Sequence, residues 1–240
     1  MSAFLEVDGV TKTFGGVAAN VDVTFTVAEG EILGLIGPNG AGKTSLFNSI
    51  GGEVSPDRGE VRMGGVRISG LGPVACARAG VARTFQVVRS FDSMTVLENV
   101  MVGAFARFGR ARPAMAEAER VLDFAGVGRV DRLAHQLSPP EKRRLEIARA
   151  LATGPRLLLL DEMLTGLTPT EAAAGVALVR AVRDQGVTIL MVEHVMEVLL
   201  PLVDRAVVLN LGRVLMQGSP AEVVRHPDVI RAYLGDRYAA

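Results

Sequence analysis

Short apolar runs alternate with segments of helical periodicity along most of the chain. Five of these runs are rich in branched aliphatic residues and end in polar positions, and they lie at 31–37, 81–86, 156–162, 187–194 and 205–212. Apolar strands that alternate with helices are typical of a largely parallel sheet with helices on its faces. The pattern therefore predicts an α/β core.

The first part of the chain has a different pattern. The segments 4–14, 21–27 and 59–69 are short β-type stretches broken by Gly or Asn, which indicates an antiparallel subdomain. Between Val96 and Gly128 the pattern is mostly helical, with an interruption at 107–113, and reads as an inserted subdomain. There is no internal repeat and no low-complexity linker.

Composition narrows the class of protein. A length of 240 residues suits one large α/β domain, alone or with a small helical insert. The 26 basic side chains balance the 26 acidic ones, so no overall field favours nucleic acid. The single cysteine, Cys76, excludes an internal disulfide and a cysteine metal cluster, and we expect an inert thiol.

We find neither a signal-peptide pattern nor a membrane-span pattern in the sequence. The N-terminal residues lack a basic region followed by an apolar core, so we expect no signal peptide. No run reaches the roughly 18 to 20 apolar residues of a membrane span. We therefore expect a cytosolic chain that could still dock on a membrane protein.

The strongest chemical signal follows the strand at 31–37. Residues 37–44 match G-x-x-x-x-G-K-[ST] in full, and this P-loop comprises Gly37, Pro38, Asn39, Gly40, Ala41, Gly42, Lys43 and Thr44. It stands between an apolar strand and a helical segment, the context in which its amides and Lys43 hold phosphates and Thr44 binds Mg²⁺. A glycine-rich turn with a solvated lysine is the alternative, and it leaves this context unexplained. The motif predicts ATP or GTP binding.

Two adjacent acids end the strand at 156–162. Asp161 suits a metal shell, usually through water, and Glu162 suits a general base that activates the attacking water. A strand that simply ends in polar residues is the alternative, and a complete P-loop in the same chain argues against it.

Two further candidates are ambiguous when taken alone. His194 ends the strand at 187–194 and is a candidate γ-phosphate sensor, although a histidine there is more often a loop or core residue. Gln86 could cap a turn or complete the Mg²⁺ shell. His135 and His226 lie in polar loop contexts and receive no role.

Together the P-loop, "TFQ", "LS" before a basic helix, "LLLLDE" and "EH", in this order, resemble the ATP-binding subunit of ABC transporters over nearly the entire chain. Three further stretches, 81–100, 143–153 and 227–235, resemble the ATPases of branched-chain and hydrophobic amino-acid importers. The resemblance implies a single ABC ATPase domain over 1–240. It would comprise a β subdomain with the first part of the core (1–86), a helical subdomain with the signature helix (87–153), and the remaining core and tail (154–240).

The resemblance also implies roles for single residues. Phe14 would stack on adenine, and the P-loop with Ser45 would hold the phosphates and the metal. Gln86 would complete the metal shell and relay its state to the membrane subunits. Two such subunits would close face to face, so that Ser138 of one chain's signature contacts the ATP held by the other.

The signature departs from the family pattern L-S-G-G-Q. The chain reads Leu137-Ser138-Pro139-Pro140-Glu141, so Pro140 offers no amide and Glu141 would bring a negative charge toward an anionic site. Met163 and Thr168 also replace residues usual in the family.

These departures suggest an asymmetric pair with a second, different ATPase subunit. Two alternatives remain open: a working variant that contacts phosphate through Ser138 and the next free amides, or a merely rigid helix start.

The resemblance also implies partners. The segment Val87–Pro113, with its interspersed arginines, would receive two membrane permease subunits, although ordinary helix packing gives the same pattern.

We therefore expect an importer ATPase that uses Mg-ATP at the inner face of the cell membrane and works indirectly with an extracytoplasmic binding protein. The alternatives are an ABC system with another cargo, a regulatory subunit active only in a heterodimer, and a soluble ABC protein acting on nucleic acid or ribosomes. Balanced charge and a single cassette argue against the last of these.

Overall fold

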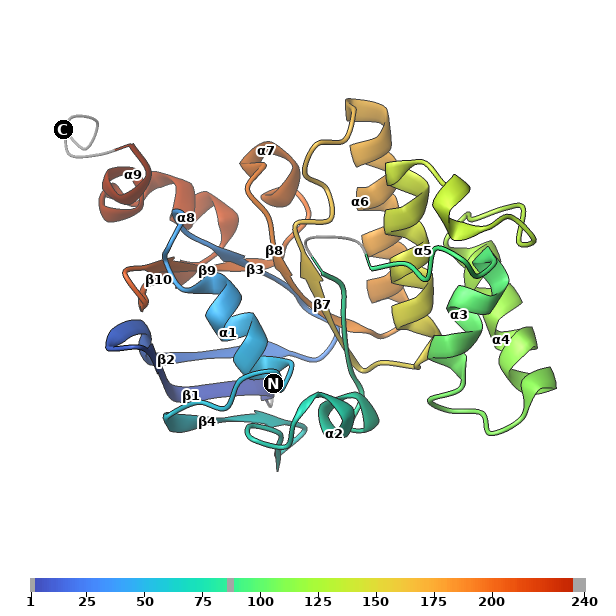
Figure 1. The fold of residues 1–240 in the computed structure, drawn as a ribbon. Coiled ribbons are helices and arrows are strands. Elements are labelled where there is room, and N and C mark those ends of the chain that lie inside the picture. The colour runs from blue at the N-terminus through green and yellow to red at the C-terminus, as the bar shows by residue number, and fades with distance from the viewer. Residues whose placement is uncertain (1–2, 86–88, 235–240) are drawn as a thin grey trace.

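A computed structural model describes residues 3–85 and 89–234 of the chain (Figure 1). Its strands form two sheets, and most of its helices lie between the sheets or at the far side of the larger one. The predicted α/β class with an antiparallel part and a helical part is confirmed.

The smaller sheet is formed by the N-terminal third of the chain. Its four strands are arranged in the order β2-β1-β4-β5, and each pair is antiparallel. The strands are β1 (Ala3–Phe14), β2 (Val17–Ala28), β4 (Arg58–Met63) and β5 (Val66–Arg67). This is the antiparallel subdomain that the sequence predicts.

The larger sheet contains all five of the predicted apolar strands. Its order is β10-β9-β3-β8-β7-β6, and only β10 runs antiparallel to its neighbour. The strands are β3 (Ile32–Ile36), β6 (Val81–Arg83), β7 (Leu157–Asp161), β8 (Thr188–Val192), β9 (Arg205–Asn210) and β10 (Arg213–Gly218).

Alternate residues of these central strands enter two separate hydrophobic cores. In β7, Leu158 and Leu160 face one core while Leu157 and Leu159 face the other. Because side chains alternate across a strand, an unbroken apolar run implies that both faces are covered. This explains why these strands show no polar alternation in the sequence.

The helix α1 (Lys43–Ile50) lies between the two sheets, where Leu46, Phe47 and Ile50 are buried (Figure 1). The opposite face of the large sheet carries α6 (Pro169–Asp184) and the helices on the right of Figure 1, α3 (Val96–Ala104), α4 (Ala111–Phe124) and α5 (Pro139–Ala152). Shorter helices complete the fold: α2 (Pro73–Arg78), the 3₁₀ turn Ala134–Gln136, α7 (Met196–Leu199), α8 (Pro220–Arg225) and α9 (Pro227–Leu234).

The helical insert agrees with the sequence pattern, with one correction. The interruption predicted at 107–113 is shorter, because α4 already begins at Ala111 and includes Pro113 in its first turn, where a proline costs no helical hydrogen bond. Boundaries at 86 and 153 between subdomains remain a proposal. Within the described residues no helix is both long and apolar enough to span a bilayer.

The parallel strands place the candidate residues along one edge. Lys43 follows β3, Asp161 ends β7 and His194 follows β8. The carboxyl ends of neighbouring parallel strands meet at the same edge of the sheet, which is where open α/β sheets bind ligands. Three distant stretches of sequence are thereby brought to one place.

Candidate functional site

The backbone of the P-loop is shaped by two glycines that have no room for a side chain. Gly37 and Gly42 have φ angles of 152° and 100°, and a Cβ atom on either would lie 2.2 Å from a carbonyl oxygen, that of Leu209 or Ala19. Gly40 also has a positive φ, 79°, but open space around it. The loop therefore wraps closely over β2 and β9.

Lys43 points into the loop that it follows. Its side chain is buried, and its Nζ donates to the carbonyl oxygens of Gly37 (2.6 Å) and Pro38 (3.0 Å). Burial lowers the pKa of Lys43, while the nearby carboxylates of Glu162 and Asp161 oppose that change. A cation held over a loop of inward-facing amides is suited to the oxygens of a phosphate group.

A cavity of about 530 Å³ lies directly over this loop. Its size is within the range of small-molecule sites. It is lined by Val17, Ala18, Ala19, Asn39, Gly40, Ala41, Gly42, Lys43, Thr44, Ser45, Glu162 and His194. The structure thus brings most of the predicted phosphate-binding residues together with Glu162 and His194.

Glu162 and His194 line the cavity side by side and contact each other. His194 Nε2 lies 2.6 Å from Glu162 Oε1, and the Glu162 amide donates to the carbonyl oxygen of Val192 (2.9 Å). Glu162 has a positive φ of 51°, which is unfavourable for a residue with a side chain and is typical of functional sites. The backbone turn directs the carboxylate toward His194, where the pair could hold a water molecule.

Asp161 lies on the other side of Thr44. It is 6% exposed at the end of β7, and its Oδ2 accepts a hydrogen bond from Arg83 (3.1 Å). Burial raises the pKa of Asp161, and the Arg83 guanidinium opposes that shift. A second cavity, of about 380 Å³, is lined by Thr44, Asn48, Glu53, Arg83, Phe85, Arg89 and Asp161.

The two predicted metal ligands in the described part of the chain therefore line one cavity. No group of three or more His, Cys, Asp or Glu side chains among the described residues could hold a metal by itself. One hydroxyl and one carboxylate, Thr44 and Asp161, suit Mg²⁺, which usually keeps waters and is bound with substrate phosphates. Gln86, the third predicted ligand, lies outside the described residues.

The loop after the two acids is fixed by Glu193, a residue that received no role from the sequence. Its buried carboxylate accepts hydrogen bonds from the Leu164 amide and the Thr165 hydroxyl (3.1 Å). Burial raises the pKa of Glu193, and these hydrogen bonds oppose that shift. The contacts tie the loop after Glu162 to the strand end that carries His194.

Two candidates lie apart from the cavity. Phe14 ends β1, is 45% exposed and lies under the ammonium of Lys12, 5.4 Å from the ring centroid. It is not among the described residues that line the cavity, although Val17 to Ala19 beyond the same turn are. Ser138 is exposed at the start of α5 and also lies outside that lining.

The start of α5 explains the sequence Ser138-Pro139-Pro140-Glu141. The Glu141 carboxylate accepts from the Ser138 amide and hydroxyl, both at 2.8 Å, and lies 3.1 Å from Arg132. The Glu141 carboxylate folds back onto the start of its own helix, beside Ser138. This is the reciprocal half of a capping box. That the charge of Glu141 would come near the ATP of a partner chain stays a prediction.

The group around Arg83 was not among the residues predicted from the sequence. Arg83 lies 2.6 Å from Asn48 Oδ1, 3.1 Å from Glu53 and 3.1 Å from Asp161. The available signal was an arginine at the end of a buried strand, a position that demands an acidic partner. Asn48 and Glu53 gave no signal of their own, because nothing in their spacing relates them to β6.

Two family models match parts of the chain. A family model described as "ABC transporter" matches residues 21–165, and one described as "Branched-chain amino acid ATP-binding cassette transporter" matches residues 213–239.

Curated relatives match nearly the whole chain. The high-affinity branched-chain amino acid transport ATP-binding protein BraF of Pseudomonas aeruginosa is 39% identical over 97% of this chain and 98% of its own length. The corresponding protein LivG of Escherichia coli shows the same identity and coverage.

A solved structure has the same fold. The crystal structure of a nucleotide-free ATP-binding cassette from an ABC transporter superposes with a TM-score of 0.89 and 28% identity, over 98% of this chain and 100% of that one. With its P-loop, its two acids and its histidine on one sheet edge, the chain belongs to the ABC transporter family, as an ATP-hydrolysing cassette.

Proposed function

We propose that this chain is the ATPase subunit of an importer for branched-chain or other hydrophobic amino acids. The observation that carries the proposal is the match to BraF and LivG over nearly the whole length, together with the C-terminal family match at 213–239. The catalytic residues alone do not select a cargo, because an ATPase does not contact what the permease carries.

In this proposal Mg-ATP occupies the cavity over the P-loop. The amides of the loop and Lys43 hold the phosphates, and Ser45 and Phe14 complete the nucleotide site. Bound Mg²⁺ would supply charge neutralisation at the phosphates, with Thr44, Asp161 and Gln86 as its protein ligands. Glu162 orients the attacking water and accepts its proton, and His194 senses the γ-phosphate.

The partners follow from the same proposal. The chain pairs with a second ATPase subunit and works with two permease subunits, and indirectly with an extracytoplasmic binding protein, at the inner face of the membrane. A cavity of about 490 Å³ supports a permease contact, because it lies between the core and the helical part and is lined by Phe85, Arg89, Phe91 and Val102, among others. Its mixed apolar and basic lining fits a helix end of a membrane subunit.

The experiment measures amino-acid uptake by the source organism after deletion of the gene that encodes this chain. We expect labelled leucine uptake to fall and the unmodified chain to restore it. The Glu162→Gln variant should not restore it, since loss of a general base slows the chemical step by about 100-fold or more. Uptake of labelled glutamate serves as the control for general damage.

Two results would contradict different parts of the proposal. Unchanged leucine uptake in the deletion strain would remove the cargo assignment and leave the ATPase assignment intact. Normal rescue by Glu162→Gln would remove Glu162 from its catalytic role.

A further inference from the structure

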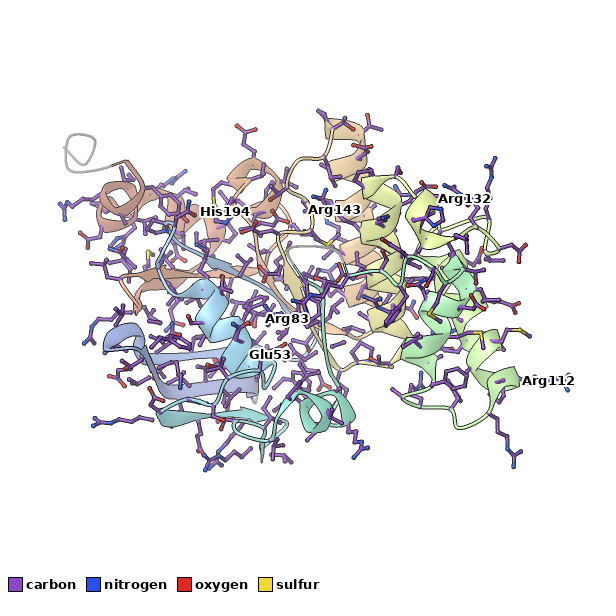
Figure 2. All side chains as sticks on the ribbon, in the orientation of Figure 1. Glu53, Arg83, Arg112, Arg132, Arg143 and His194 are labelled. Atoms are coloured by element: carbon purple, nitrogen blue, oxygen red, sulfur yellow. The ribbon has the colours of Figure 1, made fainter. Side chains whose placement is uncertain are left out.

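A buried arginine joins the candidate metal ligand to two other parts of the core. Arg83 is the last residue of β6, and its side chain is 9% exposed. Figure 2 shows Arg83 and Glu53 next to each other where α1 faces the large sheet. The guanidinium contacts Asn48 of α1, Glu53 beyond the end of that helix, and Asp161 of β7.

The three contacts fix the position of the guanidinium. Arg83 Nη1 reaches Asn48 (2.6 Å) and Glu53 (3.1 Å), and Nη2 reaches Asp161 (3.1 Å). A buried charge is retained only where partners compensate for lost water. Because the partners come from α1, the loop after it and β7, the fold itself determines where the guanidinium lies.

The ring of Phe85 adds a further constraint. The Arg83 guanidinium lies 5.2 Å from the centroid of that ring, and Arg89 lies 4.3 Å from the same centroid. A planar guanidinium can stack on a ring and bind carboxylates in the same plane, which the ammonium of a lysine cannot do. The site therefore suits arginine better than lysine.

Arg83 contacts one of the two carboxylate oxygens of Asp161. Arg83 binds the Oδ2 atom, and Asp161 also borders the cavity that contains Thr44. The Asp161 amide donates to the Thr84 hydroxyl (3.2 Å), so its main chain and side chain are both tied to residues 83 and 84. This arrangement fixes the carboxylate at the border of the cavity that Thr44 also lines.

We propose that Arg83 is the positioning residue of the metal site, holding the Asp161 carboxylate in the orientation in which it receives a nucleotide-bound divalent cation beside Thr44. The proposal rests on the proposed role of Asp161 and goes beyond it by assigning a supporting residue. Residues that orient metal ligands typically change metal affinity by about 10- to 100-fold when replaced.

If Arg83 instead took the place of the metal ion, its removal would change metal affinity in the opposite direction. An arginine that merely occupies the place of the cation would repel it, and removal of such an arginine would tighten metal binding. Measurement of metal affinity therefore separates the two roles, whereas loss of ATPase activity would fit both.

The experiment measures Mn²⁺ binding to the purified full-length chain saturated with ADP, read from the electron paramagnetic resonance of bound Mn²⁺. We expect Arg83→Met to weaken Mn²⁺ binding by about 10-fold or more, and Arg83→Lys to weaken it less. ADP binding without metal should stay within about 2-fold, because Arg83 does not line the cavity over the P-loop.

The matched control is Arg205→Met. Arg205 makes an ion pair of the same length, 3.1 Å, with the buried Glu31 at the opposite edge of the same sheet. Its loss should lower the melting temperature without changing Mn²⁺ affinity. If Arg83→Met does not fold, Asn48→Ala tests the same link, since it removes one contact of Arg83 without changing the charge of the cavity, and it should also weaken Mn²⁺ binding.

Each outcome decides one point. Unchanged or tighter Mn²⁺ binding in the folded Arg83→Met variant, or in Asn48→Ala where Arg83→Met does not fold, overturns the proposal. If the unmodified chain binds neither ADP nor Mn²⁺, the proposed nucleotide site itself is wrong, which is a distinct result.

Discussion

At the residue scale, the atoms next to each glycine of the P-loop determine whether that glycine can be substituted. Gly42 and Gly40 both have positive φ angles, but only at Gly42 does a carbonyl oxygen occupy the place of a Cβ atom. A positive φ costs a residue with a side chain about 1 to 2 kcal/mol. A clash with main chain adds to this cost, because the loop must then move.

This comparison gives the first prediction. Gly40→Ala should lower the free energy of unfolding by about 1 kcal/mol and leave the loop in place. Gly42→Ala should cost about 3 kcal/mol or more and abolish nucleotide binding, because it displaces the loop from β2. Denaturation followed by circular dichroism, with a fluorescent nucleotide for binding, measures both effects. Equal costs for the two variants would contradict the clash.

Glu146 is a second residue whose environment determines its behaviour. It is buried in α5 and accepts a hydrogen bond from the Phe85 amide (3.2 Å), with Arg149 3.9 Å away. Burial raises the pKa of Glu146 to about 6, although these contacts oppose the shift. The folded chain therefore binds a proton at pH values where the unfolded chain has released it.

The second prediction follows from the sign of that shift. The stabilisation is present below the ordinary glutamate pKa of about 4.3 and is lost as the pH rises through about 6. Relative to Glu146→Gln, the unmodified chain should lose on the order of 2 kcal/mol of unfolding free energy between pH 4 and pH 8. Urea denaturation at both pH values measures this difference. A constant difference would show that Glu146 does not titrate in this range.

At the element scale, helix starts follow a repeated pattern. The sequence Ser/Thr-Pro-x-Glu begins α5 at Ser138, α6 at Thr168 and α8 at Ser219, and in each case the glutamate carboxylate accepts from the capping residue. Proline at the first helical position costs no hydrogen bond, and the reciprocal cap satisfies an exposed amide. Helix stability alone therefore explains Glu141 and one of the two prolines.

The third prediction concerns this cap. Glu141→Ala should lower the free energy of unfolding by about 1 kcal/mol at pH 7. Hydrogen bonds from Ser138, and then the charge of Arg132, lower the pKa of Glu141. Its contribution is therefore present above the ordinary glutamate pKa and is lost as the pH falls below it. Thermal unfolding at pH 7 and pH 3 measures this, with the exposed Glu119→Ala of α4 as control. A deficit that persists at pH 3 would contradict the role of the charged carboxylate.

At the scale of the whole molecule, the sequence predicts contiguous features better than assembled ones. The P-loop, Asp161 and Glu162 could be predicted as candidates because contiguous residues carry each signal, and the fold brings them to one edge of the sheet. Arg83 was missed because its partners, Asn48 and Glu53, come from segments brought beside it only by the fold. The capping role of Glu141 was not predicted, although Ser138 and Glu141 have the spacing of a capping box.

The fourth prediction concerns pairing, where we propose a different second subunit. The purified Glu162→Gln variant should bind Mg-ATP yet keep a mass near 25.4 kDa, because Pro139 and Pro140 offer no amides and Glu141 engages the Ser138 hydroxyl. Light scattering measures the mass, and a fluorescent nucleotide confirms binding.

A matched variant sharpens this test. Restoring the family pattern with Pro139→Gly, Pro140→Gly and Glu141→Gln in the Glu162→Gln chain should allow a dimer with Mg-ATP. A dimer without these changes would show that the natural signature works and that the chain can pair with itself.

The division of the interior into two cores has a consequence for how the chain tolerates change. Side chains of α1 and of α6 belong to different cores, separated by the large sheet. Substitutions that share no neighbours have additive effects on stability, so Phe47→Leu and Val179→Ala should sum. Substitutions on one side of the sheet can thus accumulate independently of substitutions on the other side.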